Sequence, residues 1–293
     1  MPLVPVREIL QRARAENYAV GYFESWNFES LQGVIDAVES VRAPVIIGFN
    51  GEFMSAPGRR AAERLEWYAA LGRAAAATAR VPCGFIFNEC ADDDWLRRAA
   101  TAGFNLIMPA DAAVPHEVYE QRVAALVPIA HAAGAAVEAE IGLLPNGADA
   151  THPGEATDPE LAARFVAATG IDLLAVSVGN VHIKLEGREP LDLSHLERIR
   201  RRVDIPLVLH GGTGISTESL VAAIKFGIVK VNYGTCLKQA YLRAVRRALA
   251  APETNPHELL GIGGDADLMV AGRLAVRDAV LERIEPLGCC GRA

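Results

Sequence analysis

Two histidines, His182 and His210, each lie at the end of a short apolar run of the kind that forms a buried β-strand. Neighbouring strands in a sheet lie about 5 Å apart, so two such imidazoles can share one ion through ring nitrogens about 2.1 Å from it. Glu89 and Glu140 can add a carboxylate, and this ligand set suits Zn²⁺, Fe²⁺, Mn²⁺ or Co²⁺. The pattern predicts a divalent metal site. The alternative is that each histidine only forms a hydrogen bond at the rim of a sheet.

Two glycine-rich segments follow apolar runs in the last third of the chain. They contain Gly211, Gly212, Thr213 and Gly214 in the first segment, and Asn232, Gly234 and Thr235 in the second. Glycines let backbone N–H groups come close to an anion, and the N-terminus of a following helix favours negative charge. We therefore expect a phosphate site here, against the alternative of two tight turns.

Short β-branched or aromatic runs alternate with longer helical patterns. The expected strands are Ala19–Phe23, Pro44–Phe49, Gly84–Asn88, Phe104–Met108, Ala136–Ile141, Asp172–Val178, Pro206–His210 and Val229–Asn232. The expected helices are Leu31–Val41, Arg60–Ala79, Asp93–Ala102, His116–Ala133, Pro159–Thr169, Ser194–Arg202, Thr217–Phe226 and Leu237–Ala250, with an extra C-terminal helix, Gly272–Ile284. This order predicts an α/β fold, a (β/α)₈ TIM barrel that forms a single domain over residues 1–293. An open doubly wound sheet is the alternative, but no G-x-G-x-x-G follows the first strand.

In such a barrel the chemistry lies just beyond the C-terminal ends of the strands. The polar residues at or near these ends are Glu24, Asn50, Asn88, Glu89, Asp111, Glu138, Glu140, His182, His210 and Asn232. The long segment Leu143–Thr157 interrupts the pattern and is rich in Gly, Pro, Ala and Asp. Loops of this length are often mobile lids over an active site, although an inert surface loop has the same composition.

Composition excludes several classes of protein. The net charge of −7 disfavours nucleic acid as a partner, because such binding needs a basic stripe. The five cysteines form no disulfide pattern, and we expect a reducing, cytoplasmic location. No run of 18 apolar residues occurs and the N-terminus does not read as a signal peptide, so no membrane contact is expected.

Taken in order, these segments resemble the class II, metal-dependent fructose-bisphosphate and tagatose-bisphosphate aldolases. The resemblance runs nearly end to end and includes Ala19–Gly21, Ala43–Ile46, Val137–Gly142, Gly179–His182, His210–Gly214, Lys230–Asn232 and Leu287–Ala293. It implies a divalent cation, zinc first, held by three histidines, of which His182 and His210 match two. The cation would polarise the ketone of dihydroxyacetone phosphate and stabilise its enediolate.

The resemblance also implies the phosphate contacts. Gly211, Thr213, Asn232 and Thr235 match residues that bind the phosphate and the ketose in the family. Arg273 matches an arginine that reaches the second phosphate of a bisphosphate, often from a neighbouring subunit.

The third strand departs from the family pattern H-L-D-H-G. This chain has Ile86-Phe87-Asn88-Glu89-Cys90, so Asn88 replaces the acid and Glu89 replaces a metal-ligating histidine. An amide can hydrogen-bond a developing alkoxide but cannot deliver a titratable proton. Glu24 and Asn50 stand where the family has Asn and Ser. The phosphate half of the site is therefore kept, and the aldehyde half is rebuilt.

The leading hypothesis is a metal-dependent aldolase, an aldehyde-lyase acting on a phosphorylated ketose. The metal would be held by His182, His210 and Glu89, with Asn88, Glu89 and Glu140 as catalytic residues. The alternatives are a sugar-phosphate isomerase or epimerase, and a non-catalytic phosphosugar-binding protein on the same scaffold. The expected partner is a small sugar phosphate, and the chain is expected to form a homodimer or homotetramer through residues 60–79 or the C-terminal helix.

Overall fold

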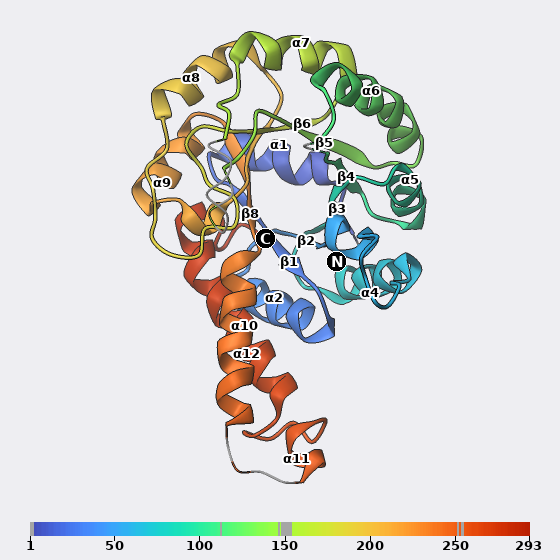
Figure 1. Ribbon diagram of the computed structural model, residues 1–293. Coiled ribbons are helices and arrows are strands. Elements are labelled where there is room, and N and C mark those ends of the chain that lie inside the picture. The colour runs from blue at the N-terminus through green and yellow to red at the C-terminus, as the bar shows by residue number, and fades with distance from the viewer. Residues whose placement is uncertain (1–2, 112, 146, 148–153, 251, 253–254) are drawn as a thin grey trace.

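The strands close into one parallel barrel in which each strand pairs with the next and β8 pairs with β1 (Figure 1). This computed structural model describes residues 3–111, 113–145, 147, 154–250, 252 and 255–293. The strands are β1 (Val20–Ser25), β2 (Val45–Asn50), β3 (Cys83–Cys90), β4 (Leu106–Pro109), β5 (Ala136–Ile141), β6 (Leu173–Val176), β7 (Leu207–Leu209) and β8 (Ile228–Tyr233). The predicted barrel is confirmed, with the bounds of β5 as expected and the other bounds shifted slightly.

Helices follow the strands and cover the outside of the barrel. They are α2 (Phe28–Ser40), α3 (Gly51–Ser55), α4 (Leu65–Thr78), α5 (Asp93–Ala102), α6 (His116–Ala132), α7 (Pro159–Thr169), α8 (Leu193–Arg202), α9 (Thr217–Lys225), α10 (Thr235–Leu249), α11 (Pro256–Leu259) and α12 (Leu268–Ile284). The predicted helix at residues 60–79 was wrong at its start. Arg59 donates hydrogen bonds to the carbonyls of Phe53 and Ala61 and so ties the preceding segment into a loop.

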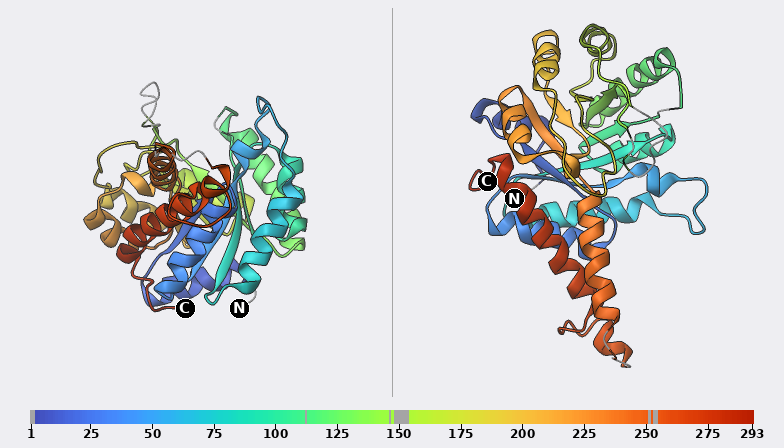
Figure 2. Two further views of the ribbon diagram at one scale, coloured as in Figure 1. Left: turned by 90° about the horizontal axis from the view of Figure 1, so that it is seen from below. Right: turned by 60° about the vertical axis from the view of Figure 1, so that its left-hand side comes forward.

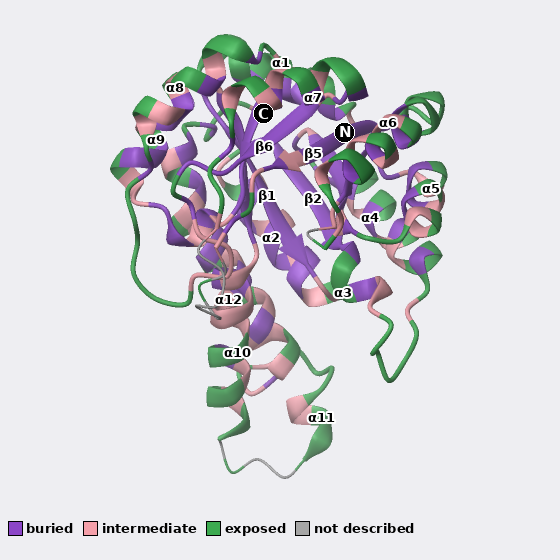
Figure 3. Cartoon of the chain, turned by 45° about the horizontal axis from the view of Figure 1, so that its top comes forward, coloured by how far each residue is buried: buried purple, intermediate pink, exposed green. Residues whose placement is uncertain are grey.

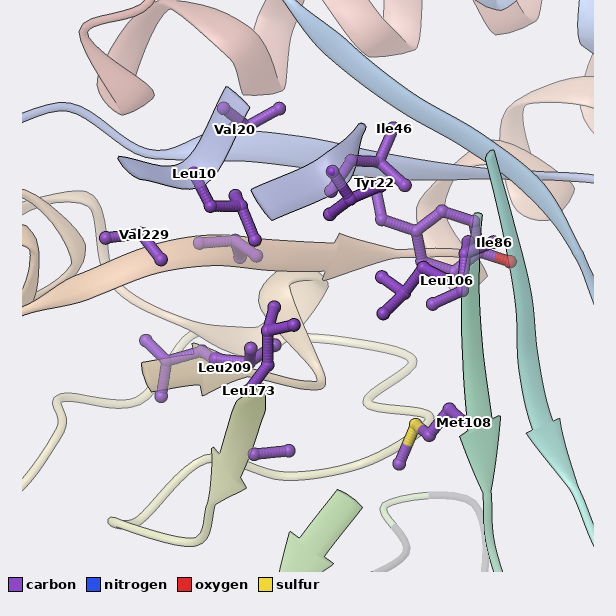
Figure 4. Packing of buried hydrophobic residues seen from close by; sticks show 14 of the residues in the cluster. Leu10, Val20, Tyr22, Ile46, Ile86, Leu106, Met108, Leu173, Leu209 and Val229 are labelled. Carbon is purple, nitrogen blue, oxygen red and sulfur yellow. The ribbon is translucent and has the colours of Figure 1, made fainter. Parts of the chain in front are cut away.

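One helix that the sequence analysis did not identify, α1 (Val6–Glu16), precedes the barrel. It packs against β1, β3 and β8, and its buried residues Val6, Ile9, Leu10 and Ala13 recur at helical spacing. Figure 4 shows Leu10 among the buried side chains of the barrel strands. The N-terminal helix thus supplies part of the apolar core, and the polar strand ends lie at the other mouth of the barrel.

Helices α10 and α12 lie side by side and extend away from the barrel, with the short α11 near their far end (Figures 1 and 2). The inner part of α12 packs on α2, whereas the far part of α10 is largely exposed (Figure 3). Several large apolar side chains on this arm are exposed, namely Leu242, Leu249, Leu260, Ile262 and Met269. Among the described residues, no helix is long and apolar enough to cross a membrane.

The barrel interior leaves no room for an added methyl group at Gly48. A Cβ atom there would lie 2.1 Å from the carbonyl oxygen of Ile86 on the paired strand. We expect Gly48→Ala to lower the free energy of unfolding by about 1–3 kcal/mol, because the two backbones must move apart. Gly58→Ala is the matched control, since nothing lies within 4 Å of its added Cβ. Urea unfolding measures both variants, and equal stabilities would contradict the prediction.

Candidate active site

The end of β3 turns Glu89 into the barrel mouth. Asn50 and Asn88 are paired residues on β2 and β3, so the residue after Asn88 would face away from them in a regular strand. The β3–β4 register is instead irregular between Phe87 and Cys90, and Glu89 has a φ of 52°. Left-handed backbone at a residue other than glycine is strained and is frequent at functional sites. This irregularity directs Glu89 toward the two histidines.

Carboxylates surround the imidazole of His210. Its Nε2 lies 2.9 Å from Oε1 of Glu138, while its Nδ1 lies 2.9 Å from Oε2 of Glu140 and 3.3 Å from Oε1 of Glu89. Glu138 and Glu140 are two residues apart on β5 and therefore face the same side of the sheet. The structure thus brings together residues that the sequence analysis grouped at one site, namely Glu89, Glu140 and His210.

His182 reaches the same cluster from the loop after β6. Its Nε2 lies 3.7 Å from Oε1 of Glu89. Asn180 ties its loop to the end of β7, because its amide donates to the carbonyls of Val176 and His210. Gly211 permits the close approach of the two loops, since an added Cβ would lie 2.2 Å from the carbonyl oxygen of Val181. The two predicted ligand histidines therefore share one carboxylate oxygen as a neighbour.

The buried charges of this cluster perturb one another. Burial alone would raise the pKa of Glu89, but the hydrogen bond from His210 and the positive charges of both histidines lower it to about 2. Burial alone would lower the pKa of His210, but the carboxylates of Glu140, Glu138 and Glu89 raise it well above its usual value. The cluster therefore strongly favours a positive charge at its centre.

A lysine inside the barrel balances part of this negative charge. Nζ of Lys230 lies 2.8 Å from Oε2 of Glu138 and 2.6 Å from Oδ1 of Asn232, which accepts its hydrogen bond. Lys230 and Glu138 are completely buried. The sequence analysis did not assign a role to Lys230, because its partner is 92 residues away in the chain. It fixes Glu138, which in turn orients His210.

Several buried polar atoms at the mouth have no hydrogen-bond partner. These are the hydroxyl of Tyr22, Oδ1 of Asn88 and Nδ2 of Asn232. Buried polar atoms in folded proteins normally find a partner in the protein, in water or in a ligand. These atoms are therefore available to hydrogen-bond water or a polar ligand beside the charged cluster.

The two glycine-rich segments lie side by side at the neighbouring part of the mouth. Gly212–Gly214 forms a short 3₁₀ turn, and Oγ1 of Thr213 accepts a hydrogen bond from the amide of Cys236 in the first turn of α10. That helix begins at Thr235, and its N-cap residue Gly234 has no side chain to cap the amides. The structure thus joins a glycine turn to an open helix N-terminus, which is an arrangement that binds anions.

Lys184 lies over the same glycine turn and was not identified from the sequence. An added Cβ at Gly214 would lie 2.8 Å from Cβ of Lys184, and Nζ of Lys184 donates to Glu189 over 2.7 Å. The position of Lys184, two residues after His182, was the feature of the sequence from which it could have been identified. Its positive charge lies beside the predicted phosphate site and is paired with Glu189.

Other predicted residues are engaged elsewhere. Arg273 on α12 is held by Asp36 of α2 through bonds of 2.5 and 2.8 Å, between two outer helices. The carboxylate of Asp111 accepts the amide of Ala113 in a local turn. In the long segment Leu143–Thr157, Asp149 lies outside the described residues, and Glu155 pairs with Leu143 through backbone bonds.

The donor atoms around Glu89 fit a divalent cation. Among the described residues, no three His, Cys, Asp or Glu side chains are already arranged as metal ligands. The separations of 3.3 and 3.7 Å from Oε1 of Glu89 to His210 and His182 nevertheless match two pairs of ligands, because ligands about 2.1 Å from a tetrahedral ion lie about 3.4 Å apart. Two imidazole nitrogens and a carboxylate oxygen are suitable donors.

The fold and this arrangement define a (β/α)₈-barrel enzyme with its site at the carboxyl ends of the strands. The model of the family described as "Fructose-bisphosphate aldolase class-II" matches residues 4–292. The chain therefore belongs to the class-II fructose-bisphosphate aldolase family, whose members are aldehyde-lyases that generally depend on a divalent metal.

Solved structures agree with this assignment. The chain is 33% identical to the YdjI aldolase of Escherichia coli K12, with 100% of both chains covered and a TM-score of 0.81. It is 21% identical to a fructose-bisphosphate aldolase of Campylobacter jejuni, with 100% of this chain and 97% of the other covered and a TM-score of 0.78. The second comparison supports the fold.

The buried pair of Lys230 and Glu138 gives a stability prediction. We expect Lys230→Met to lower the free energy of unfolding by about 3–5 kcal/mol, because it leaves a buried carboxylate with too little compensating charge. Lys225→Met, at an exposed position, is the control and should change it by less than about 0.5 kcal/mol. Urea unfolding at neutral pH measures both, and a stability loss at Lys230 no larger than the control would contradict the role of the pair.

Proposed function

We propose that this protein is a metal-dependent aldolase that cleaves a phosphorylated ketose, or forms it from dihydroxyacetone phosphate and an aldehyde. The observation that carries the proposal is the irregular end of β3, which directs Glu89 toward both His210 and His182. A carboxylate takes the place of a ligand histidine, and the anion site next to it is built from backbone amides.

We assign His182, His210 and Glu89 as ligands of a divalent cation, with zinc as the first candidate. When bound, the cation supplies Lewis acidity that polarises a ketone oxygen. Glu138 orients the imidazole of His210 through Nε2, and Asn50 donates a 2.7 Å hydrogen bond to Oε2 of Glu89. Such outer contacts fix the direction in which a ligand presents its donor atom.

The glycine-rich segments bind the phosphate of the ketose. Gly211, Gly212 and Thr213 supply backbone and hydroxyl contacts, and the open N-terminus of α10 at Gly234 and Thr235 favours the negative charge. The free Nδ2 of Asn232 is a donor for a ketose oxygen. With these contacts, the phosphate would lie beside β7 and β8, and the ketone would lie at the metal ligands.

Two residues at the mouth act on the reacting carbons. Asn88 orients the aldehyde oxygen through its amide, which cannot itself release a proton near neutral pH. Glu140 is partly exposed at the mouth and is the carboxylate that accepts the proton from the carbon next to the ketone. The carbon–carbon bond breaks or forms between that carbon and the aldehyde carbon.

We also propose a cytoplasmic location and a homodimer or homotetramer. All five cysteines are free thiols, which suits a reducing compartment. The exposed apolar residues on the arm of α10 to α12 provide a surface for a second copy of the chain.

Metal binding tests the assignment of Glu89. We expect Glu89→Gln to weaken zinc affinity by roughly 100-fold or more, since loss of outer partners alone typically costs about 10–100-fold. Zinc titration of the apoprotein by calorimetry measures the change, and Glu117→Gln, at an exposed helix position, is the control. Equal affinity in both variants would show that Glu89 is not a ligand.

Proton exchange separates the aldolase from the other functions of this scaffold. We expect the metal-loaded protein to exchange one carbon-bound hydrogen of dihydroxyacetone phosphate with deuterated water, and to form a new ketose phosphate only when an aldehyde is added. NMR follows both events. Conversion of one phosphosugar to an isomer without any aldehyde would indicate an isomerase or epimerase, and binding without exchange would indicate a phosphosugar-binding protein.

A further inference from the structure

A cavity adjoins the cluster of Glu89, His182 and His210, between the ends of β1 and β2. It has a volume of about 270 Å³ and is bounded by α3, the loop before α4 and the start of α10. Figure 3 shows α3 beside the ends of these strands. Its apolar wall consists of Trp26, Phe49, Phe53, Met54 and Tyr68.

The cavity is connected to the reacting centre through two of its own residues. Asn50 lines it and donates to Oε2 of Glu89 over 2.7 Å. Glu24 also lines it, and its carboxylate lies against Gly234, where an added Cβ would be 2.2 Å from Oε2. A substrate whose phosphate lies at the glycine-rich segments and whose ketone lies at the metal ligands would therefore extend the rest of its carbon chain toward this cavity.

Every cation in the cavity wall already has a carboxylate partner. Nζ of Lys238 lies 2.5 Å from Oε1 of Glu24 and also 4.2 Å from the ring centre of Phe53. The guanidinium of Arg59 is paired with Glu63. The charges of these four lining residues sum to zero, so the cavity offers no spare positive charge for a phosphate or carboxylate.

A hydroxyl group in the wall has no partner. Ser25 is 1% exposed, lines the cavity, and its Oγ forms no hydrogen bond. A buried hydroxyl normally has a hydrogen-bond partner, so this one is available to a polar group of a ligand or to water. An aromatic wall with a few placed polar groups is typical of a pocket for a small uncharged molecule.

Within this chain, the arginine expected to bind a second phosphate does not supply the missing charge. Arg273 is held by both carboxylate oxygens of Asp36 on α2. Releasing it would leave Asp36 without its partner.

We infer that this cavity is the aldehyde subsite and that it takes an uncharged hydroxyaldehyde, so that the ketose product carries one phosphate. The inference rests on the proposed aldolase function and specifies its substrate class. In the synthetic direction, dihydroxyacetone phosphate loses one proton from carbon, that carbon bonds to the aldehyde carbon, and the aldehyde oxygen gains one proton. No oxidant or further reactant is needed.

The test compares aldehydes with one donor on the zinc-loaded full chain. With dihydroxyacetone phosphate as donor, we expect kcat/KM to be at least about tenfold higher for glyceraldehyde or lactaldehyde than for glyceraldehyde 3-phosphate, because the phosphate must enter beside Glu24 and Glu63. A preference for glyceraldehyde 3-phosphate would overturn the inference and leave the aldolase function intact. Absence of deuterium exchange into dihydroxyacetone phosphate alone would overturn the aldolase function and this inference with it.

A variant tests the role of the buried hydroxyl. We expect Ser25→Ala to lower kcat/KM for glyceraldehyde by about fivefold and to leave that for propionaldehyde, which has no hydroxyl, nearly unchanged. Ser40→Ala, at the end of α2, is the matched control. An equal loss for both aldehydes would show that Ser25 acts only on the structure and does not contact the substrate.

Discussion

The site depends on the charge held around the imidazole of His210. Glu89, Glu138 and Glu140 bring three negative charges within hydrogen-bond or ion-pair distance of it, and Lys230 returns one positive charge. With His210 protonated, the three carboxylates, Lys230 and His210 together carry a net charge of about −1. Like charges buried close together are unfavourable unless they are offset. A divalent cation that replaces that proton brings the sum to zero. The surrounding carboxylates therefore suit a cation-binding centre better than an isolated imidazolium.

Placing a carboxylate at this point requires an unusual backbone. Glu89 adopts left-handed geometry at the irregular end of β3, and Ile183 does the same directly after His182. Each such residue costs of order 1–3 kcal/mol and persists only when its surroundings hold it. Asn50 fixes the Glu89 carboxylate, and the paired backbone bonds between Pro145, Gly147 and His182 hold the second loop. The strain lies at the two points where Glu89 and His182 turn into the barrel mouth.

Sequence patterns were sufficient to predict the barrel and the residues of the cluster, because parallel strands buried on both faces read as apolar runs that end in polar side chains. The same periodicity is present in α1, where Val6, Ile9, Leu10 and Ala13 mark one face, but no helix was predicted there from the sequence. Contacts between distant positions could not be predicted. The bond of Arg273 to Asp36 spans 237 residues and depends on how two outer helices pack.

The two halves of the mouth differ in how they use charge, and α10 serves both. Its N-terminus at Gly234 and Thr235 faces the glycine turn, where the backbone amides carry partial positive charge and the N-cap residue Gly234 has no side chain. One turn later, Lys238 points to the other half, but Glu24 and the ring of Phe53 already occupy it. One helix thus presents an open anion site on one side and a neutralised wall on the other. Discrimination between two ligands needs an unfavourable contact for the wrong one as well as a favourable contact for the right one. The difference between the two sides of α10 can therefore orient a substrate that carries a phosphate at only one end.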